Sequence, residues 1–150
     1  MARRIRRHHS PGIIPDEVQR RLLDAWYSPE RLSQDLVAPG STFLVAELSG
    51  DLVGFAQYVR RSAESVELTR IYVLPGGQRS GIGARLLGTA LAEFADEGLK
   101  RLTVAVEQEN LVGRRFYEKM GFTEPRGLIH ELHGYSLKLV EYRRAISPSD

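Results

Sequence analysis

The chain has 150 residues and a formal net charge of +2, with 21 Lys and Arg against 19 Asp and Glu. Four arginines within the first seven residues contribute +4, so the remainder carries −2, which disfavours a nucleic-acid partner for the folded body. The absence of cysteine excludes disulfides, thiolate zinc sites and thiol nucleophiles, and no stretch approaches the roughly 20 apolar residues of a membrane span. We therefore expect one domain over residues 1–150, located in the cytoplasm, with no membrane partner.

The N-terminal part of the chain predicts a basic strand and two short helices. Residues 3–9 are expected to form a solvated terminal strand, and contact of this arm with phosphates is the alternative. Residues 13–26 place apolar side chains at helical spacing behind a proline and two acids. Residues 28–40 repeat the pattern, with Ser28 as the N-cap and Pro29 at the first helical position.

The middle of the chain predicts three strands. Residues 42–48 and 51–61 are rich in strand-forming residues and are separated by Ser49 and Gly50, which favours a hairpin. Residues 65–74 form a third strand that ends at a proline.

The second half alternates helices and strands. Residues 82–95 carry an apolar stripe at helical spacing, and residues 101–107 form an apolar strand typical of burial on both faces. Asn110 is the expected N-cap of a helix over 110–122, and residues 128–142 supply two more strands. This order predicts an α/β fold with a mixed sheet.

The stretch "LPGGQRSGIGARLL", residues 74–87, joins the third strand to the first of these later helices. It is not a dinucleotide fingerprint, because Leu86 stands where the third glycine should be, and not a P-loop, because Ile82 and Gly83 replace lysine and serine or threonine. The N–H groups of residues 80–84 at the helix start suit a phosphate or pyrophosphate. The alternative is that the glycines serve only a turn and close helix packing.

The segment "QRSGIG" resembles the acetyl-coenzyme A binding signature of the GNAT family of N-acetyltransferases. The resemblance extends to "ELTRIYVLP" before it, and to "LLGTALAEFADEGLKRLTVAV" and "ENLVGRRFYEKMGF" after it, covering about residues 40–142. It implies a fold of about seven strands in a mixed sheet flanked by four helices, splayed between the fourth and fifth strands. It also implies acetyl-coenzyme A as cosubstrate and no metal.

The resemblance assigns two catalytic residues. Tyr117 is expected to donate a proton to the departing thiolate, and Glu67 to accept the proton of the attacking amine, directly or through water. Strand alternation with Thr69 and Ile71 puts Glu67 on the cofactor-facing side if no bulge intervenes. The alternatives are a packing tyrosine and an ordinary exposed strand glutamate.

The resemblance also implies how the cofactor is held. The main chain of Ile71 and Val73 would pair with the pantetheine amides, and the N–H of Val73 or a neighbour would stabilise the oxyanion. The N–H groups at the helix start would hold the pyrophosphate. The implied cofactor-binding residues are Ile71, Tyr72, Val73, Gln78, Arg79, Ser80, Gly81, Ile82, Gly83, Ala84, Asn110 and Phe116.

The acceptor is less defined. "SPERLSQDL" and "GSTFLVAE" are similar to bacterial spermidine/spermine acetyltransferases, so we expect direct attack by a small-molecule amine in a ternary complex, with Glu47, Asp51 and Glu64 as candidate acids near it. Alternatives are acetylation of protein N-termini or lysines and a non-catalytic acetyl-coenzyme A binding module. Ala105 replaces the glutamate usual in the branch that acetylates the N-termini of ribosomal proteins, which weakens the assignment to that branch.

Several features have no settled role. Arg114 and Arg115 form either a solvated helix face or a contact to the 3′-phosphate of the cofactor. His130 and His133 make a poor metal site, because a third ligand is missing. Formation of a homodimer is left open.

Overall fold

A computed structural model describes residues 3–9, 34, 38–74, 81–132 and 134–150. The helix expected over 13–26 lies outside the described residues. Of the helix expected over 28–40, only Gln34, which is helical, and the turn leading into the next strand are described. The central part of the glycine-rich stretch, residues 75–80, also lies outside them.

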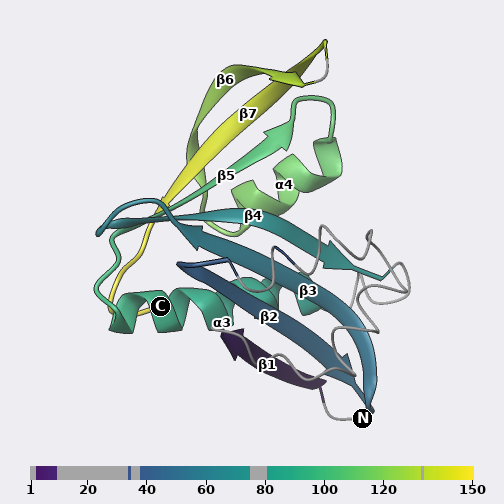
Figure 1. The fold of residues 1–150 in the computed structure, drawn as a ribbon, viewed down its shortest axis with the longest axis vertical. Helices are drawn as coiled ribbons and strands as arrows, with labels where there is room; N and C mark the ends of the chain where they lie inside the picture. The colour runs from purple at the N-terminus through teal and green to yellow at the C-terminus, as the bar shows by residue number, and fades with distance from the viewer. Residues whose placement is uncertain (1–2, 10–33, 35–37, 75–80, 133) are drawn as a thin grey trace.

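Seven strands form one mixed sheet in the order β1-β2-β3-β4-β5-β7-β6 (Figure 1). Neighbouring strands are antiparallel except for β4 and β5, which are parallel. The expected mixed α/β sheet is therefore confirmed. The strands are β1 (Arg3–His9), β2 (Ser41–Leu48), β3 (Asp51–Arg60), β4 (Ser65–Val73), β5 (Arg101–Glu107), β6 (Thr123–Leu132) and β7 (Tyr135–Ala145).

The β2–β3 hairpin follows from its turn residues. Ser49 and Gly50 both have positive φ, 52° and 85°, and Leu48 pairs with Asp51 across the turn. Two-residue hairpins favour this backbone because its twist matches that of the strands. The hairpin expected from the sequence is confirmed.

The last two strands are longer than expected. β6 begins at Thr123 and β7 ends at Ala145, whereas the sequence predicted both strands within residues 128–142. The register with β7 shifts between Thr123 and Arg126, and Glu124 has a φ of 55°, so a bulge interrupts the start of β6. An irregular strand start has no alternating pattern, which is why the sequence did not predict it.

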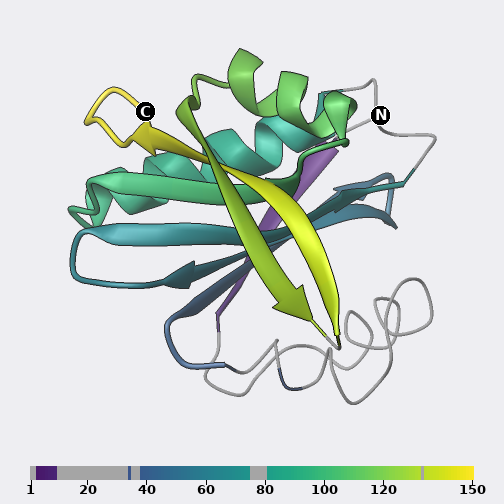
Figure 2. The same ribbon diagram turned by 90° about the horizontal axis from the view of Figure 1, so that it is seen from above.

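Both described helices, α3 (Ile82–Asp96) and α4 (Leu111–Lys119), cover the same face of the sheet (Figure 2). The apolar stripe of α3 is buried as expected, and Phe94 meets the ring of Tyr58 edge to face at 5.2 Å. Gly98, with a φ of 83°, ends α3: its N–H donates to Ala95 and the N–H of Leu99 donates to Phe94.

The sheet divides between β4 and β5. These strands pair only from Ser65 opposite Arg101 to Leu68 opposite Val104. Beyond that point both continue without pairing to each other, and Figure 1 shows them diverging. The expected splay between the fourth and fifth strands is confirmed.

Candidate active site

A cavity of about 450 Å³ lies where β4 and β5 part. Residues from β4, β5, the N-cap of α4 and α4 itself line it. The lining residues are Leu68, Thr69, Arg70, Ile71, Val104, Ala105, Val106, Glu107, Asn110 and Tyr117. Several residues that the sequence marked as functional are therefore brought together here, from segments up to about 50 positions apart.

A bulge in β4 lies beside this cavity. In the pairing of β3 with β4, Gln57 lies opposite Arg70 but its neighbour Tyr58 lies opposite Leu68. Thr69 is therefore the extra residue, and its hydroxyl donates a hydrogen bond to the Gln57 carbonyl at 3.1 Å. An extra residue reverses the alternation of side chains along the rest of a strand.

The bulge corrects the expected position of Glu67. Leu68 before the bulge and Ile71 after it both pack against the core under the helices. Glu67 therefore faces the opposite side of the sheet from Ile71, and the alternation expected from the sequence is wrong. Its Oε1 forms an ion pair with Arg61 (Nη2 at 2.6 Å, Nε at 2.8 Å), and Glu67 does not line the cavity. Its catalytic role stays a prediction.

Tyr117 is the one buried side chain of α4, with 7% of its surface exposed. Its ring meets Phe116 and Phe122 edge to face, with centroids at 5.3 and 5.5 Å. These contacts fix the ring so that the residue lines the cavity. Within the described part of the chain its hydroxyl makes no hydrogen bond. Burial raises the pKa of Tyr117 to about 12, so the hydroxyl keeps its proton at physiological pH.

Asn110 caps α4 as expected. Its Oδ1 accepts a hydrogen bond from the N–H of Gly113 at 2.9 Å, and the residue also lines the cavity. A side chain added at Gly113 would collide with Asn110, with Cβ only 2.7 Å from Nδ2. Asn110 therefore places the start of α4 at the cavity wall.

A hydrogen-bond network that the sequence did not predict ties α4 to β7. The buried Tyr142 hydroxyl donates to Glu118 Oε2 at 2.9 Å and accepts from Arg114 Nε at 3.0 Å. Arg114 Nη1 also donates to the carbonyl of Gln108 at 3.1 Å. Arg114 is thus engaged within the fold, and Tyr142 lies too far along the chain for any local pattern to reveal the pairing.

The start of α3 shows two different uses of glycine. Gly81 is the N-cap in the left-handed region, with φ 79° and ψ 14°. At Gly83 an added Cβ would lie 3.3 Å from the ring of Phe116 and 4.0 Å from Val73, so this glycine allows α3 to approach α4. The Ile82 side chain is buried in the core. Gln78, Arg79 and Ser80 lie outside the described residues.

The main-chain amides of β4 alternate between β3 and the split. The N–H of Leu74 donates to Val53 on β3 at 2.8 Å. Because successive residues of a strand direct their amides to opposite sides, Ile71 and Val73 direct theirs away from β3, toward the split. Tyr72 lies on the other sheet face, where its ring stacks on Phe55 at 6.3 Å.

The candidate acceptor acids are not at this cavity. Glu47 is buried in β2, whereas Asp51 and Glu64 are exposed, and none of the three lines it. His130 is exposed on β6, and His133 lies outside the described residues. Among the described residues, no three His, Cys, Asp or Glu side chains are grouped to hold a metal ion. Nor does that part of the chain contain a helix long and apolar enough to span a membrane.

The sheet of this chain splits around a cavity beside a helix start, and known proteins share this fold. A GNAT family acetyltransferase from Elizabethkingia anophelis, solved with acetyl-CoA bound, has the same fold: TM-score 0.69, 21% identity, covering 95% of this chain and 97% of that one.

Sequence relatives support the same assignment. An uncharacterized N-acetyltransferase of Mycobacterium tuberculosis (strain ATCC 25618 / H37Rv) is 36% identical over 112 residues, 75% of this chain and 71% of the relative. The spermidine N(1)-acetyltransferase of Thermoplasma acidophilum is 31% identical over 115 residues, 74% and 71% of the two chains. The model of the acetyltransferase (GNAT) family matches residues 6–122. The chain therefore belongs to the GNAT family of acetyltransferases.

Proposed function

We propose that this protein transfers the acetyl group of acetyl-coenzyme A to a primary amine of a small molecule, by direct attack in a ternary complex. The observation that carries the proposal is the cavity between β4 and β5, which brings Tyr117 and Asn110 to the strand that contains Ile71. Acetyl-coenzyme A would supply an activated thioester. The relative from Elizabethkingia anophelis, solved with acetyl-CoA bound, supports this choice of donor.

The residues present fit such a donor. The amides of Ile71 and Val73 face the split and would pair with the two amides of the pantetheine arm, as a further strand would. The N–H groups at the start of α3, beginning at Gly81, would bind the pyrophosphate, since a helix start favours negative charge. The acetyl group would then enter the cavity that Tyr117 lines.

Tyr117 would stabilise the leaving group. As the amine attacks, the bond from carbon to sulfur breaks and negative charge develops on sulfur. A hydroxyl with a pKa of about 12 keeps its proton and donates a hydrogen bond to that thiolate. The proton that the thiolate finally takes up is the one lost by the amine, so the products are an amide and a thiol.

The amine must be neutral to attack. A lysine-like amine has a pKa of about 10.4, so only a small fraction is neutral at pH 7. Glu67 stays our prediction for the group that takes the proton of the amine. It would act through water, because its carboxylate lies on the other face of β4, in contact with Arg61. The sequence contains no cysteine to carry an acetyl intermediate, which favours direct transfer.

Small amines are the proposed acceptors, and the similarity to a spermidine N(1)-acetyltransferase supports this class. We also retain the cytoplasm as the predicted location and a homodimer as a candidate assembly. Incubation with acetyl-coenzyme A and a panel of amines and peptides, followed by release of free thiol, tests the function. Turnover with amines supports it. Tight binding of acetyl-coenzyme A without turnover on any acceptor would favour a binding module instead.

A further inference from the structure

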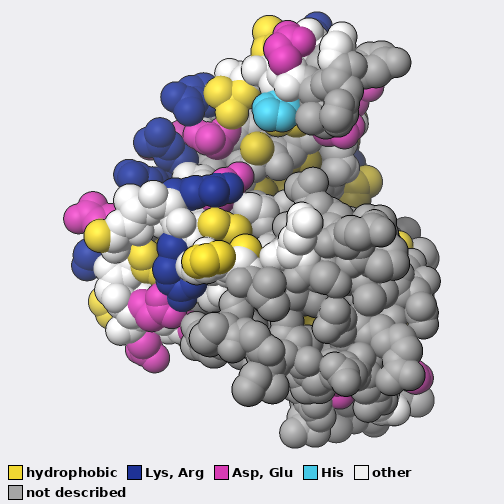
Figure 3. Space-filling view, viewed as in Figure 1, with side chains coloured by type: hydrophobic (Ala, Val, Ile, Leu, Met, Phe, Trp, Pro, Cys, Tyr) yellow, Lys and Arg dark blue, Asp and Glu magenta, His cyan; other side chains and the backbone are white. Residues whose placement is uncertain are grey.

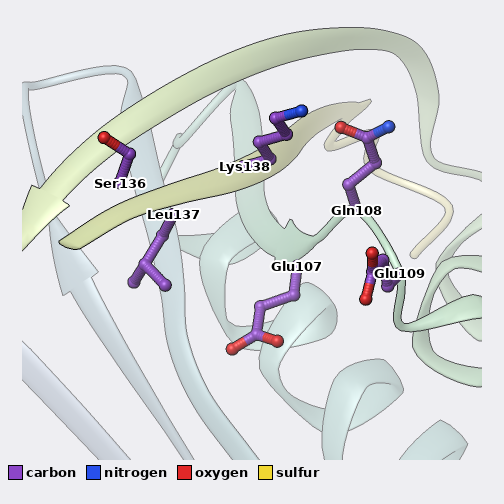
Figure 4. Close-up of a pocket in the computed structure, with 6 residues that line it drawn as sticks. All are labelled: Glu107, Gln108, Glu109, Ser136, Leu137 and Lys138. Atoms are coloured by element: carbon purple, nitrogen blue, oxygen red, sulfur yellow. The ribbon is translucent and has the colours of Figure 1, made fainter.

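A second cavity, of about 350 Å³, adjoins the first at the end of β5. Glu107, the last residue of β5, lines both cavities, so the two are neighbours on either side of this residue. The second cavity runs from the β5–α4 turn toward the start of β7. Its lining residues are Glu107, Gln108, Glu109, Ser136, Leu137 and Lys138 (Figure 4).

The carboxylate of Glu107 points away from the lysine of this cavity. Figure 4 shows the side chains of Glu107 and Leu137 extending to one side of the strands, while the amine of Lys138 extends to the other. Alternation along β7 explains this, because neighbouring residues point to opposite faces. Both Glu107 and Glu109 are exposed, and within the described part of the chain neither forms an ion pair.

Charged side chains are common on the described surface of the protein. Figure 3 shows Lys and Arg side chains gathered along one edge of the described surface, with acidic side chains among them. Two of the arginines of the chain, Arg126 and Arg61, form ion pairs with Glu141 and Glu67. Among the described residues Glu107 and Glu109 have no such basic partner.

The backbone that carries the two carboxylates is held rigidly. The Gln108 N–H donates to Lys138 at 2.9 Å, and its carbonyl accepts from Arg114 at 3.1 Å. Within the turn, the N–H of Asn110 donates to the Glu107 carbonyl at 3.0 Å. Main-chain groups of the turn are therefore hydrogen-bonded within the fold, while Glu107 and Glu109 line the cavity. A backbone that is held in place before binding loses less entropy when a ligand binds.

We propose that Glu107 and Glu109 bind the second, non-reacting ammonium group of the acceptor, which makes linear diamines and polyamines the preferred substrates. This inference rests on the proposed function and specifies its substrate class. The reacting amine would occupy the cavity between β4 and β5, while the distal amine, protonated at neutral pH, would lie in the second cavity. Leu137 offers an apolar contact for the methylene chain between them.

Kinetics with a matched pair of acceptors test the proposal. 1,4-Diaminobutane and butylamine share the reacting group and chain length, and only the former has a distal ammonium. We expect the kcat/KM of the wild-type protein to be about tenfold higher for the diamine, and Glu107→Gln to lower this ratio about fivefold, the range of a partly exposed ion pair. Glu109→Gln should lower it in the same direction.

The control variant is Glu64→Gln, which removes the same charge at an exposed residue that lines neither cavity. Its ratio should equal that of the wild type, which excludes an effect of net charge alone. The proposal is overturned if the wild type prefers butylamine, or if Glu107→Gln and Glu109→Gln leave the ratio as Glu64→Gln does. Thermal unfolding of each variant verifies that it is folded.

Calorimetric titration separates this inference from the proposed function. If the wild type releases no thiol with any acceptor, the proposed function fails, but the binding of 1,4-diaminobutane to the full chain is still measured. Binding that is tighter than that of butylamine, weakens with salt and is lost in Glu107→Gln supports the second cavity as a cation site. Equal binding of the two amines refutes it.

Discussion

Replacement of Tyr117 by phenylalanine tests the leaving-group role directly. The raised pKa of about 12 lies about 3.5 units above that of an ordinary thiol, so complete proton transfer from tyrosine to thiolate would cost about 5 kcal/mol. A hydrogen bond to the developing thiolate has no such cost. Such charge-assisted bonds contribute about 1.5–3 kcal/mol, which corresponds to a loss of about 10- to 150-fold in kcat.

The same substitution should leave the fold intact. The ring contacts of Tyr117 with Phe116 and Phe122 involve no hydroxyl, and no intramolecular hydrogen bond of that group is lost within the described residues. We expect the free energy of unfolding at pH 7 to change by less than about 1 kcal/mol. Unchanged acetyl-coenzyme A affinity with reduced kcat is therefore the expected pattern.

The pH dependence of stability gives a further check on Tyr117. Because its pKa is raised in the folded state, its contribution is fully present below pH 10.0, the ordinary value, and is lost as pH rises toward 12. Tyr117→Phe should remove this part of the alkaline destabilisation. A kcat within twofold of the wild type, or a loss of acetyl-coenzyme A affinity as large as the loss of kcat, would refute the assigned role.

Three more predictions concern the helix start, β4 and the C-terminal segment. Gly81→Asn and Gly81→Asp place similar side chains on a left-handed backbone, which both residues tolerate, and they differ only in charge. Calorimetry should show that the aspartate variant binds coenzyme A about tenfold more weakly than the asparagine variant. Equal affinities of the two variants would exclude a phosphate at this helix start. If Glu67 is the base, Glu67→Gln should abolish the acidic limb of the pH profile of kcat/KM, while Arg61→Gln should keep it. Identical profiles for the two variants would indicate that Glu67 serves only its ion pair with Arg61. Hydrogen bonds from Arg144 hold the pKa of Asp150 below its ordinary value. The contribution of Asp150 to stability is therefore present above about pH 4 and is lost as pH falls through the lowered pKa. Asp150→Asn should remove this loss in acid unfolding, and an acid transition equal to that of the wild type would contradict the prediction.

The active site contains features for which a local sequence pattern suffices. Asn110 was expected as an N-cap, and its side chain does cap α4. Tyr117 lines a cavity, and its catalytic role stays a prediction. Gly83 makes room for the ring of Phe116, which is the close helix packing that the sequence left as the alternative to ligand binding. A glycine pattern cannot distinguish room for a ligand from room for a neighbouring ring, because both require a missing side chain.

Features that depend on neighbouring residues were predictable from the sequence alone. The Ser49-Gly50 turn, the apolar stripe of α3 and its end at Gly98 follow from backbone preference and periodicity, and the mixed sheet follows from the order of the elements. The face that each β4 side chain occupies depends instead on how β4 pairs with β3. The bulge at Thr69 exists because β3 and β4 pair in a particular register, and that extra residue moves Glu67 away from the face of Ile71.

The second cavity has the same origin in long-range contacts. Glu107 and Lys138 look like any pair of surface charges until β5 pairs with β7 and the strands set their side chains on opposite faces. The bond of Arg114 to Tyr142 joins residues 28 positions apart and fixes the turn that carries both carboxylates. Register and pairing between distant strands are properties of the whole sheet, so no local stretch of sequence contains them.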